Sequence, residues 1–191
     1  MMVDTVPRMV AVLTIVCAVA AFALAEVYSV TKEPIAQSEK NDQLKAIKSV
    51  LPPYDNDPLK EVEKHKYEGA EYEFYLAKKA GQVIGRAVKV KTDAGYSGTI
   101  EIMLGIAPDA KITGIYILKQ AETPGLGARI VEKSFTDQFV GKSLAKSKIS
   151  VKKDGGDIDQ LTGATISPRA VCLAVRQGLL AHQAIYEKKT P

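Results

Sequence analysis

Potentially reactive hydroxyl groups are concentrated near the C-terminus, in residues 159–168, which read D-Q-L-T-G-A-T-I-S-P. Gly163 can adopt the positive φ of a tight turn, Ser167 is a good N-cap, and Pro168 suits the first position of a helix. We therefore predict a turn that leads directly into a helix. The hydroxyl of Thr165 would lie beside free N–H groups and the positive end of the helix dipole, which is a natural place to hold a phosphate group.

A threonine beside a capped helix is most often only part of the cap, so this arrangement alone does not define a site. The order and spacing of the residues nevertheless resemble the D-x-x-[ST]-G-A-T-x-[ST] signature of flavinylated FMN-binding domains, through Asp159, Thr162, Gly163, Ala164, Thr165 and Ser167. In that family the threonine of the G-A-T run carries FMN through a phosphoester bond made by a separate flavin transferase. The resemblance implies that Thr165 is the attachment point for covalent FMN.

Three further segments extend this resemblance. Residues 95–100 resemble the G-Y-x-G-x-I segment of the same family, which includes Tyr96, and residues 135–142 resemble its F-x-x-Q-F-x-G-K segment. The segments 95–100 and 122–127 have a simpler alternative as ordinary turns, because glycine and proline commonly mark turns. Residues 122–127 resemble the E-T-P-G-x-G loop that lies against the flavin, which implies cofactor-binding roles for Glu122, Thr123, Gly125, Leu126 and Gly127.

The resemblance covers nearly the whole chain when one N-terminal membrane helix is included. It favours the G subunits of Rnf electron-transport complexes over the C subunits of sodium-translocating NADH:quinone reductases. It implies an electron carrier, without catalytic residues of its own, within an ion-translocating ferredoxin:NAD oxidoreductase. The implied partners are other membrane subunits, including a second covalent-flavin subunit and iron–sulfur subunits. The alternative is a membrane-anchored binding domain without redox function, in which the turn is only a helix cap.

The composition is that of an ordinary globular protein. Of the 191 residues, 46% are hydrophobic and 25% are charged, and the formal net charge is +4. The densest basic stretch, residues 142–153, has no interleaved aromatic residues, so we expect a solvated surface and not a nucleic-acid groove. Neither His65 nor His182 has partners at metal-ligand spacing, so we assign no metal, and Cys17 and Cys172 are not expected to form a disulfide.

An apolar segment lies near the N-terminus, where residues 9–25 are 17 consecutive uncharged residues followed by Glu26 and Tyr28. A bilayer span needs about 20 residues, and Glu26 can lie at the interface beside Tyr28. We therefore predict a single membrane helix. A cleaved signal peptide is the alternative, because residues 23–25, A-L-A, resemble a cleavage site. The family resemblance implies the inner (cytoplasmic) membrane, with the N-terminus inside and the FMN domain on the extracytoplasmic side.

The remaining pattern predicts an α+β fold, with an antiparallel sheet and flanking helices. We divide the chain into an anchor (1–30), a linker with a short amphipathic helix (31–70) and an FMN-binding domain (71–191), in which turn residues separate predicted strands that are followed by helices. The linker itself is residues 31–38. Strands are expected at 73–77, 82–91, 98–106 and 111–119, with a helix at 128–140, a short strand at 149–151 and a final helix that ends at Tyr186.

Overall fold

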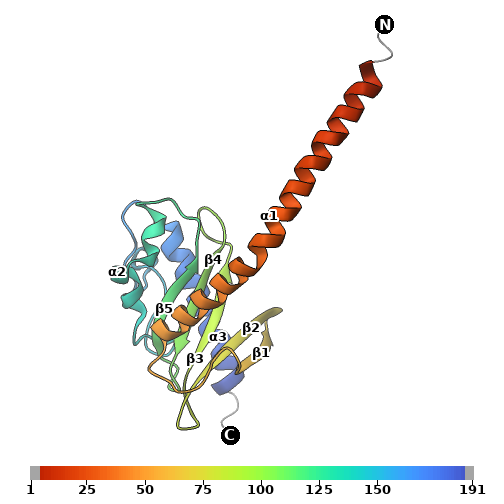
Figure 1. Cartoon of the computed structure of the whole chain (residues 1–191). Coiled ribbons are helices and arrows are strands. Elements are labelled where there is room, and N and C mark those ends of the chain that lie inside the picture. The colour runs from red at the N-terminus through yellow and green to blue at the C-terminus, as the bar shows by residue number, and fades with distance from the viewer. Residues whose placement is uncertain (1–4, 188–191) are drawn as a thin grey trace. The chain divides into compact units, whose positions relative to one another are not determined.

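The computed structural model describes residues 5–187. The chain separates into two compact units, residues 1–41 and 42–191. The first unit contains the greater part of one long helix, α1 (Thr5–Val50), whose last turns belong to the second unit (Figure 1). The second unit also contains a five-stranded sheet and the remaining helical segments.

The helix α1 is longer than the sequence pattern indicates. The linker predicted at residues 31–38 is wrong, because these residues continue the helix without interruption. Pro34 lies inside the helix and removes one backbone donor. The neighbouring Ala36, Gln37 and Lys40 are good helix formers, and this local propensity favours continuation of the helix on the C-terminal side of the proline.

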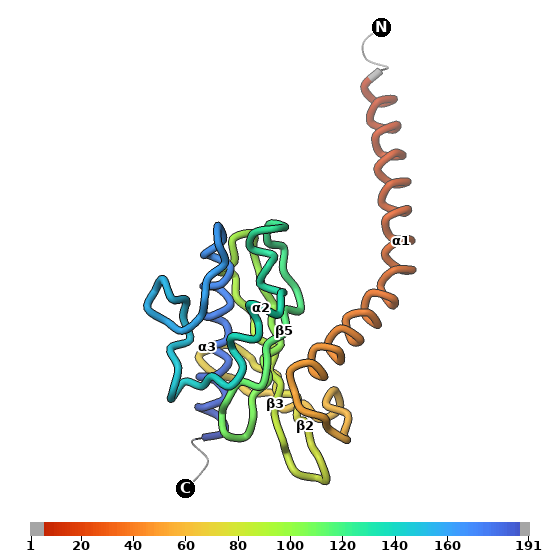
Figure 2. Tube along the Cα trace, turned by 90° about the vertical axis from the view of Figure 1, so that its left-hand side faces the viewer, coloured from red at the N-terminus to blue at the C-terminus, as the bar shows by residue number. Residues whose placement is uncertain are grey.

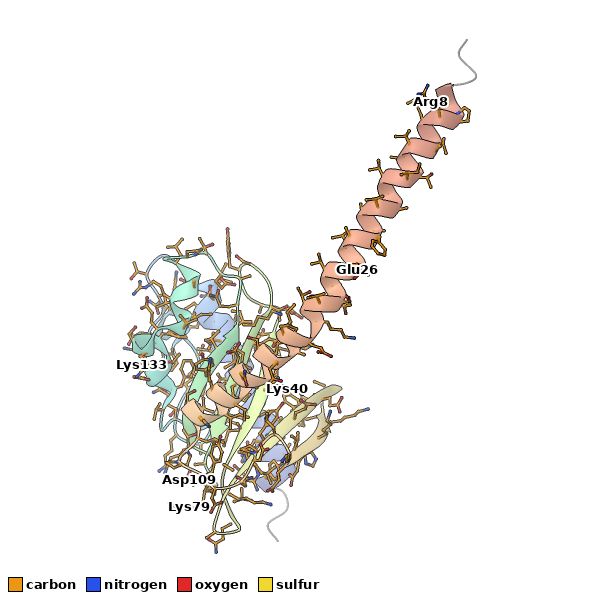
Figure 3. All side chains as sticks on the ribbon, viewed as in Figure 1. Arg8, Glu26, Lys40, Lys79, Asp109 and Lys133 are labelled. Atoms are coloured by element: carbon orange, nitrogen blue, oxygen red, sulfur yellow. The ribbon has the colours of Figure 1, made fainter. Side chains whose placement is uncertain are left out.

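The N-terminal part of α1 has the length and composition of a membrane span. Between Arg8 and Glu26, which Figure 3 labels, every side chain is uncharged and exposed. Within residues 5–187, α1 is the one helix that meets this criterion. Because a continuous exposed apolar surface of this length is unfavourable in water, a lipid environment accounts for its composition.

The second unit is built on an antiparallel sheet in the order β1-β2-β3-β4-β5, which confirms the predicted antiparallel sheet. The first strand was not among the predicted strands, because V-E-K-H-K-Y is mostly polar on both faces. The connections are short, and the turn between the second and third strands places Ala80 and Gly81 at positive φ. The strands are β1 (Val62–Tyr67), β2 (Ala70–Lys79), β3 (Gln82–Thr92), β4 (Ile100–Ile106) and β5 (Ile112–Lys119) (Figure 1).

The helix α3 (Ile166–Tyr186) covers one face of this sheet, as Figure 2 shows. Its apolar side chains, Val175 among them, join the larger of two apolar clusters. The approach is close at Gly178, where an added Cβ would lie 2.7 Å from Val90 Cγ1 and 2.9 Å from Leu104 Cδ2. The helix is therefore seated directly on β3 and β4, which fixes the position of its N-terminus.

The opposite face of the sheet is covered by the last turns of α1. Ala46, Ile47 and Val50 are buried there in a second apolar cluster with Met103, whose neighbours on β4 belong to the first cluster. The two clusters lie on opposite faces because successive side chains of a strand alternate in direction. The hydroxyl of Thr113 donates a hydrogen bond to the carbonyl of Val50 at the helix end. The predicted short amphipathic helix is thus the C-terminal end of α1.

The prediction of one continuous helix at residues 128–140 is wrong. Extended backbone at Glu132 (φ −69°, ψ 142°) divides it into short pieces that lie near β5. The division places Phe135 and Phe139 in the core, where their ring centroids are 5.5 Å apart. The pieces are η1 (Gly127–Val131), α2 (Lys133–Thr136) and η2 (Asp137–Phe139).

The segment before the final helix is largely irregular. The predicted strand at 149–151 is reduced to one bridge, between Val151 and Ile158, and is followed by η3 (Lys152–Asp154). Asp154 accepts hydrogen bonds at 2.6 and 2.7 Å from the guanidinium of Arg169, which lowers the pKa of this carboxyl group. This ion pair ties the first turns of α3 to the preceding loop.

Candidate functional site

A pocket of about 380 Å³ lies at the N-terminal end of α3. Three segments that are distant in the sequence form it: the loop after β3, the loop after β5, and the turn that precedes α3. The residues that line the pocket are Tyr96, Glu122, Thr123, Leu126, Gly127, Gly163, Ala164, Thr165, Ile166 and Ser167. The structure therefore brings together most of the residues that the sequence resemblance singles out.

The turn before α3 has the form expected from its sequence. Gly163 has φ 78°, and the backbone N–H of Ala164 donates a hydrogen bond to the carbonyl of Leu161 at 3.1 Å. Thr165 occupies the cap position of α3, but its side chain makes no capping hydrogen bond. The partly buried hydroxyl group of Thr165 therefore lines the pocket beside the first turn of a 21-residue helix.

The prediction that Ser167 is the N-cap of the final helix is wrong. The helix begins at Ile166, so Ser167 is the second helical residue and Pro168 the third, not the first. The hydroxyl of Ser167 is buried and donates a hydrogen bond to Oε2 of Glu122 at 2.5 Å. The hydrogen-bond partner of this hydroxyl group is therefore a carboxylate from another loop and not the backbone of its own helix. A capping pattern in the local sequence does not reveal such a distant partner.

Glu122 is the central polar group of the site. Its side chain is only 4% exposed, and its second oxygen, Oε1, accepts a hydrogen bond from the backbone N–H of Ser97 at 3.0 Å. Its own N–H donates to Oε1 of Gln120 at 2.6 Å. Glu122 consequently connects the loop after β3, the loop after β5 and the start of α3 through hydrogen bonds.

Two glycines allow this carboxylate to pack closely. A Cβ on Gly127 would lie 2.4 Å from Oγ of Ser167 and 2.6 Å from Oε2 of Glu122. A Cβ on Gly95 would lie 2.2 Å from the carbonyl oxygen of Gly98 and 2.8 Å from Oε1 of Glu122. Both positions need glycine because no side chain fits, and both belong to the segments that the family resemblance indicates.

Three of the residues predicted to bind the cofactor do not line the pocket. Thr162 is exposed, and Gly125, at φ 74°, would direct a Cβ into open space. The carboxylate of Asp159 forms an ion pair with Lys152 at 2.8 Å. The backbone N–H of Asp159 donates a hydrogen bond to Oε1 of Gln138 at 2.6 Å. The glutamine of segment 135–142 therefore holds the chain just before the turn and does not line the pocket.

The sequence reasoning missed Ile166. This side chain is 45% exposed and lines the pocket directly after Thr165. The available signal in the sequence was a large apolar residue placed between Thr165 and Ser167 in the signature. Tyr96 and Leu126, which are 69% and 44% exposed, contribute further apolar surface. A pocket with apolar walls beside a helix N-terminus suits a ligand with a flat apolar ring and an anionic end, as FMN has.

Comparison with known proteins agrees with this geometry. Residues 95–180, which contain all three pocket-forming segments, match the FMN-binding domain family. The sequence is 36% identical to the G subunit of the ion-translocating oxidoreductase complex of Aliivibrio fischeri. The match covers 90% of this chain and 88% of that subunit. It is 37% identical, over 90% of the chain and 89% of the relative, to the G subunit of the Na(+)-translocating ferredoxin:NAD(+) oxidoreductase complex of Acetobacterium woodii.

A solved structure shows the related fold. The C subunit of the Na(+)-translocating NADH-quinone reductase from Parabacteroides distasonis is 27% identical to this chain, with a TM-score of 0.51 over 66% of each chain. The identity to the G subunits is higher and covers far more of the sequence. The chain therefore belongs to the family of G subunits of ion-translocating oxidoreductase complexes, which confirms the resemblance to the Rnf G subunits.

Proposed function

We propose that this protein is a membrane-anchored electron carrier, with FMN covalently bound to Thr165, in an ion-translocating ferredoxin:NAD⁺ oxidoreductase complex. The observation that supports the attachment site best is the position of Thr165. Its hydroxyl lines the pocket at the start of α3 and makes no capping hydrogen bond. Helix N-termini favour anionic groups, and a phosphodiester at this oxygen retains one negative charge.

The pocket has separate surfaces for the two ends of FMN. The phosphate end is held by Thr165 and the first turn of α3, while Tyr96, Leu126 and Ile166 supply apolar surface for the ring. The loop after β5 also lines the pocket, through Thr123 and Gly127 among others, so its backbone can approach the polar edge of the ring. When bound, FMN supplies one- and two-electron transfer, and the protein supplies position and electrostatics.

The surroundings of the hydroxyl groups favour Thr165 over its neighbours as the attachment point. Ser167 is buried and its hydroxyl is engaged by Glu122, whereas Thr162 lies outside the pocket. None of the described residues that line the pocket is a histidine or lysine that could activate the hydroxyl as a nucleophile. This composition supports attachment by a separate flavin transferase. A covalent bond prevents loss of the flavin through dissociation.

The membrane arrangement is part of the same proposal. Residues 1–30 form the anchor, with α1 crossing the cytoplasmic membrane once and residues 71–191 forming the FMN-binding domain on the extracytoplasmic side. The apolar composition of α1 supports the single span. The proposed partners are the other membrane subunits of the complex, including a second flavin subunit and iron–sulfur subunits. The relatives' designation as one subunit of a complex supports the general part of this proposal, assembly with other subunits.

The test is expression of the full chain together with a flavin transferase, followed by mass spectrometry of the intact protein. The wild-type protein should carry the FMN mass and should fluoresce as a band in a denaturing gel. Thr165→Ala should lose both signals and remain folded, because a partly exposed hydroxyl is removed and no core contact is lost. Thr162→Ala is the matched control and should keep them.

Two outcomes would contradict the proposal in different ways. Retention of the FMN mass by Thr165→Ala would overturn the assignment of the attachment residue. A wild-type protein that stays colourless in the presence of an active transferase would favour the non-redox binding domain.

A further inference from the structure

We propose that Glu122 is a positioning residue that locks the three segments of the pocket together and, through its buried negative charge, lowers the reduction potential of the bound flavin. The inference rests on the proposed function, since it concerns the same pocket. It assigns to Glu122 a role through other residues and through its charge, and not a direct contact with the ring.

The positional part follows from the hydrogen bonds of the carboxylate. Oε1 accepts from the N–H of Ser97 at 3.0 Å and Oε2 accepts from the hydroxyl of Ser167 at 2.5 Å. Ser97 belongs to the loop after β3, whereas Ser167 lies two residues after Thr165, in the first turn of α3. Glu122 thus connects the attachment turn to the loop that carries Tyr96, although 45 residues separate Glu122 from Ser167.

The packing around the carboxylate shows that this connection is built closely into the fold. Gly95 and Gly127 lie against its two oxygens, where an added Cβ would be 2.8 Å from Oε1 and 2.6 Å from Oε2. Backbone therefore covers the carboxylate on two sides, and the side chain is almost fully buried. A buried polar group of this kind needs its hydrogen bonds, since loss of one partner leaves a buried polar atom unsatisfied.

The electrostatic part follows from the charge environment of the carboxylate, which has no cationic side chain within 4.0 Å among residues 5–187. Among the described residues, Glu122 takes part in none of the ion pairs. It is also the only charged side chain among the described residues that line the pocket. Its two partners are a neutral N–H and a neutral hydroxyl group. The close contacts of its charge are therefore with dipoles, and the N-terminal end of α3 adds a further favourable dipole.

A fixed negative charge at this place opposes reduction of the flavin. Each electron that enters the ring adds one negative charge unless a proton enters with it. Repulsion between like charges is stronger in a partly desolvated pocket than in water, so the reduced form is destabilised relative to the oxidised form. The reduction potential consequently falls, which suits a carrier that must pass electrons onward.

Glu122→Gln separates charge from shape. The amide of glutamine can accept a hydrogen bond from the Ser97 N–H with its oxygen and donate one to the rotatable hydroxyl of Ser167. Both connections are therefore preserved while the charge is removed. Glu122→Ala removes both connections as well as the charge. Glu71→Gln is the matched control, because Glu71 is an exposed glutamate of β2 outside the pocket.

The potential is measured by titration of the full-length, FMN-loaded proteins with dithionite in the presence of a reference dye. Compared per FMN bound, Glu122→Gln should show a more positive potential than the wild type, whereas Glu71→Gln should leave the potential unchanged. A Glu122→Gln potential equal to that of the wild type would overturn the electrostatic part. A wild type without FMN would instead overturn the proposed function.

The positional part has a readout that does not require the flavin. In the Thr165→Ala background, Glu122→Ala should accelerate hydrogen exchange of the Ser97 amide and of the turn 163–167 by at least tenfold, and Glu122→Gln should restore slow exchange. Equal exchange rates in all three proteins would show that the carboxylate does not lock these segments.

Discussion

Three hydroxyl side chains of the signature lie within six consecutive residues, 162–167, yet their surroundings differ. Thr162 is exposed outside the pocket, Thr165 lines it, and Ser167 is buried against Glu122. The amino-acid types are nearly equivalent in chemistry, so burial and hydrogen bonding decide which hydroxyl group remains available. At the residue scale, the site is therefore defined by the environment of each side chain.

A second residue with an unusual environment is His182, far from the pocket-lining set. Its ring is 2% exposed, and neither ring nitrogen has a hydrogen-bond partner among the described residues. It packs against the rings of Phe74 and Tyr186. Burial, and secondarily the charge of Arg86, lowers the pKa of His182 to about 4. The histidine is therefore neutral in the folded protein at neutral pH.

This environment predicts a loss of stability in mild acid. The pKa of His182 is about 6.5 in the unfolded chain and about 4 in the folded protein, so between these values only the unfolded state binds the proton. The free energy of unfolding should fall as the pH decreases through this window, by roughly 3 kcal/mol in total. Urea unfolding at pH 7, 6, 5 and 4 measures this slope.

His182→Phe is the appropriate comparison, because it keeps an aromatic ring among Phe74 and Tyr186 but cannot bind a proton. The difference in unfolding free energy between the wild type and this variant should change with pH over the same window. A constant difference from pH 7 to pH 4 would show that His182 does not contribute to the acid sensitivity.

The loop of residues 122–127 shows how one element combines two kinds of glycine. Gly125 has a positive φ and its added Cβ would meet nothing within 4 Å, whereas Gly127 is confined by Ser167 and Glu122. Gly125 is required by backbone conformation and Gly127 by space. At the element scale, the two positions should therefore respond differently to the same substitution.

Gly127→Ala should disturb the site more than Gly125→Ala. In Gly127→Ala the methyl group must displace the hydrogen bond between Ser167 and Glu122, so the start of α3 shifts and FMN loading falls severalfold. In Gly125→Ala the methyl group has room, and the cost is only the backbone strain of about 1–2 kcal/mol. Quantitative flavin fluorescence in denaturing gels, with thermal unfolding, separates the two effects. Equal FMN loading in both variants would contradict this reading of Gly127.

The whole molecule consists of a membrane-compatible helix whose final turns belong to the folded unit of residues 42–191. Ala46, Ile47 and Val50 are buried at 0–2% exposure in the second apolar cluster. The boundary of the folded unit therefore lies inside α1 and not at the end of the helix. A soluble fragment must include these turns.

Deletion of residues 1–30 should give a soluble, folded protein, because the apolar part of α1 is removed and the buried turns are kept. Deletion of residues 1–51 should lower the unfolding free energy by several kcal/mol, at roughly 2 kcal/mol for each large apolar side chain that loses its buried position. Chemical unfolding of the two fragments measures the difference. Membrane association of fragment 31–191 without partners, or equal stability of the two fragments, would contradict this arrangement.

The sequence by itself determined the features that depend on local patterns. The uncharged run of residues 9–25, the short apolar segments of β2–β5, the turn at Gly163 and the helix that ends at Tyr186 each carry their signal within a short window. The ordered segments around Thr165 and Glu122 were sufficient to indicate the family. These predictions held because hydrophobic periodicity and turn chemistry act between near neighbours in the chain.

Tertiary structure decided the features that depend on distant partners. Ser167 has the character of an N-cap in its local sequence, but the carboxylate of Glu122, 45 residues away, takes its hydroxyl group. Residues 128–140 have helical periodicity, but extended backbone at Glu132 interrupts the helix, and the apolar residues of this segment reach the core beside β5. In these two places a hydrogen bond to a distant carboxylate and the burial of apolar side chains outweigh the local preference of the sequence.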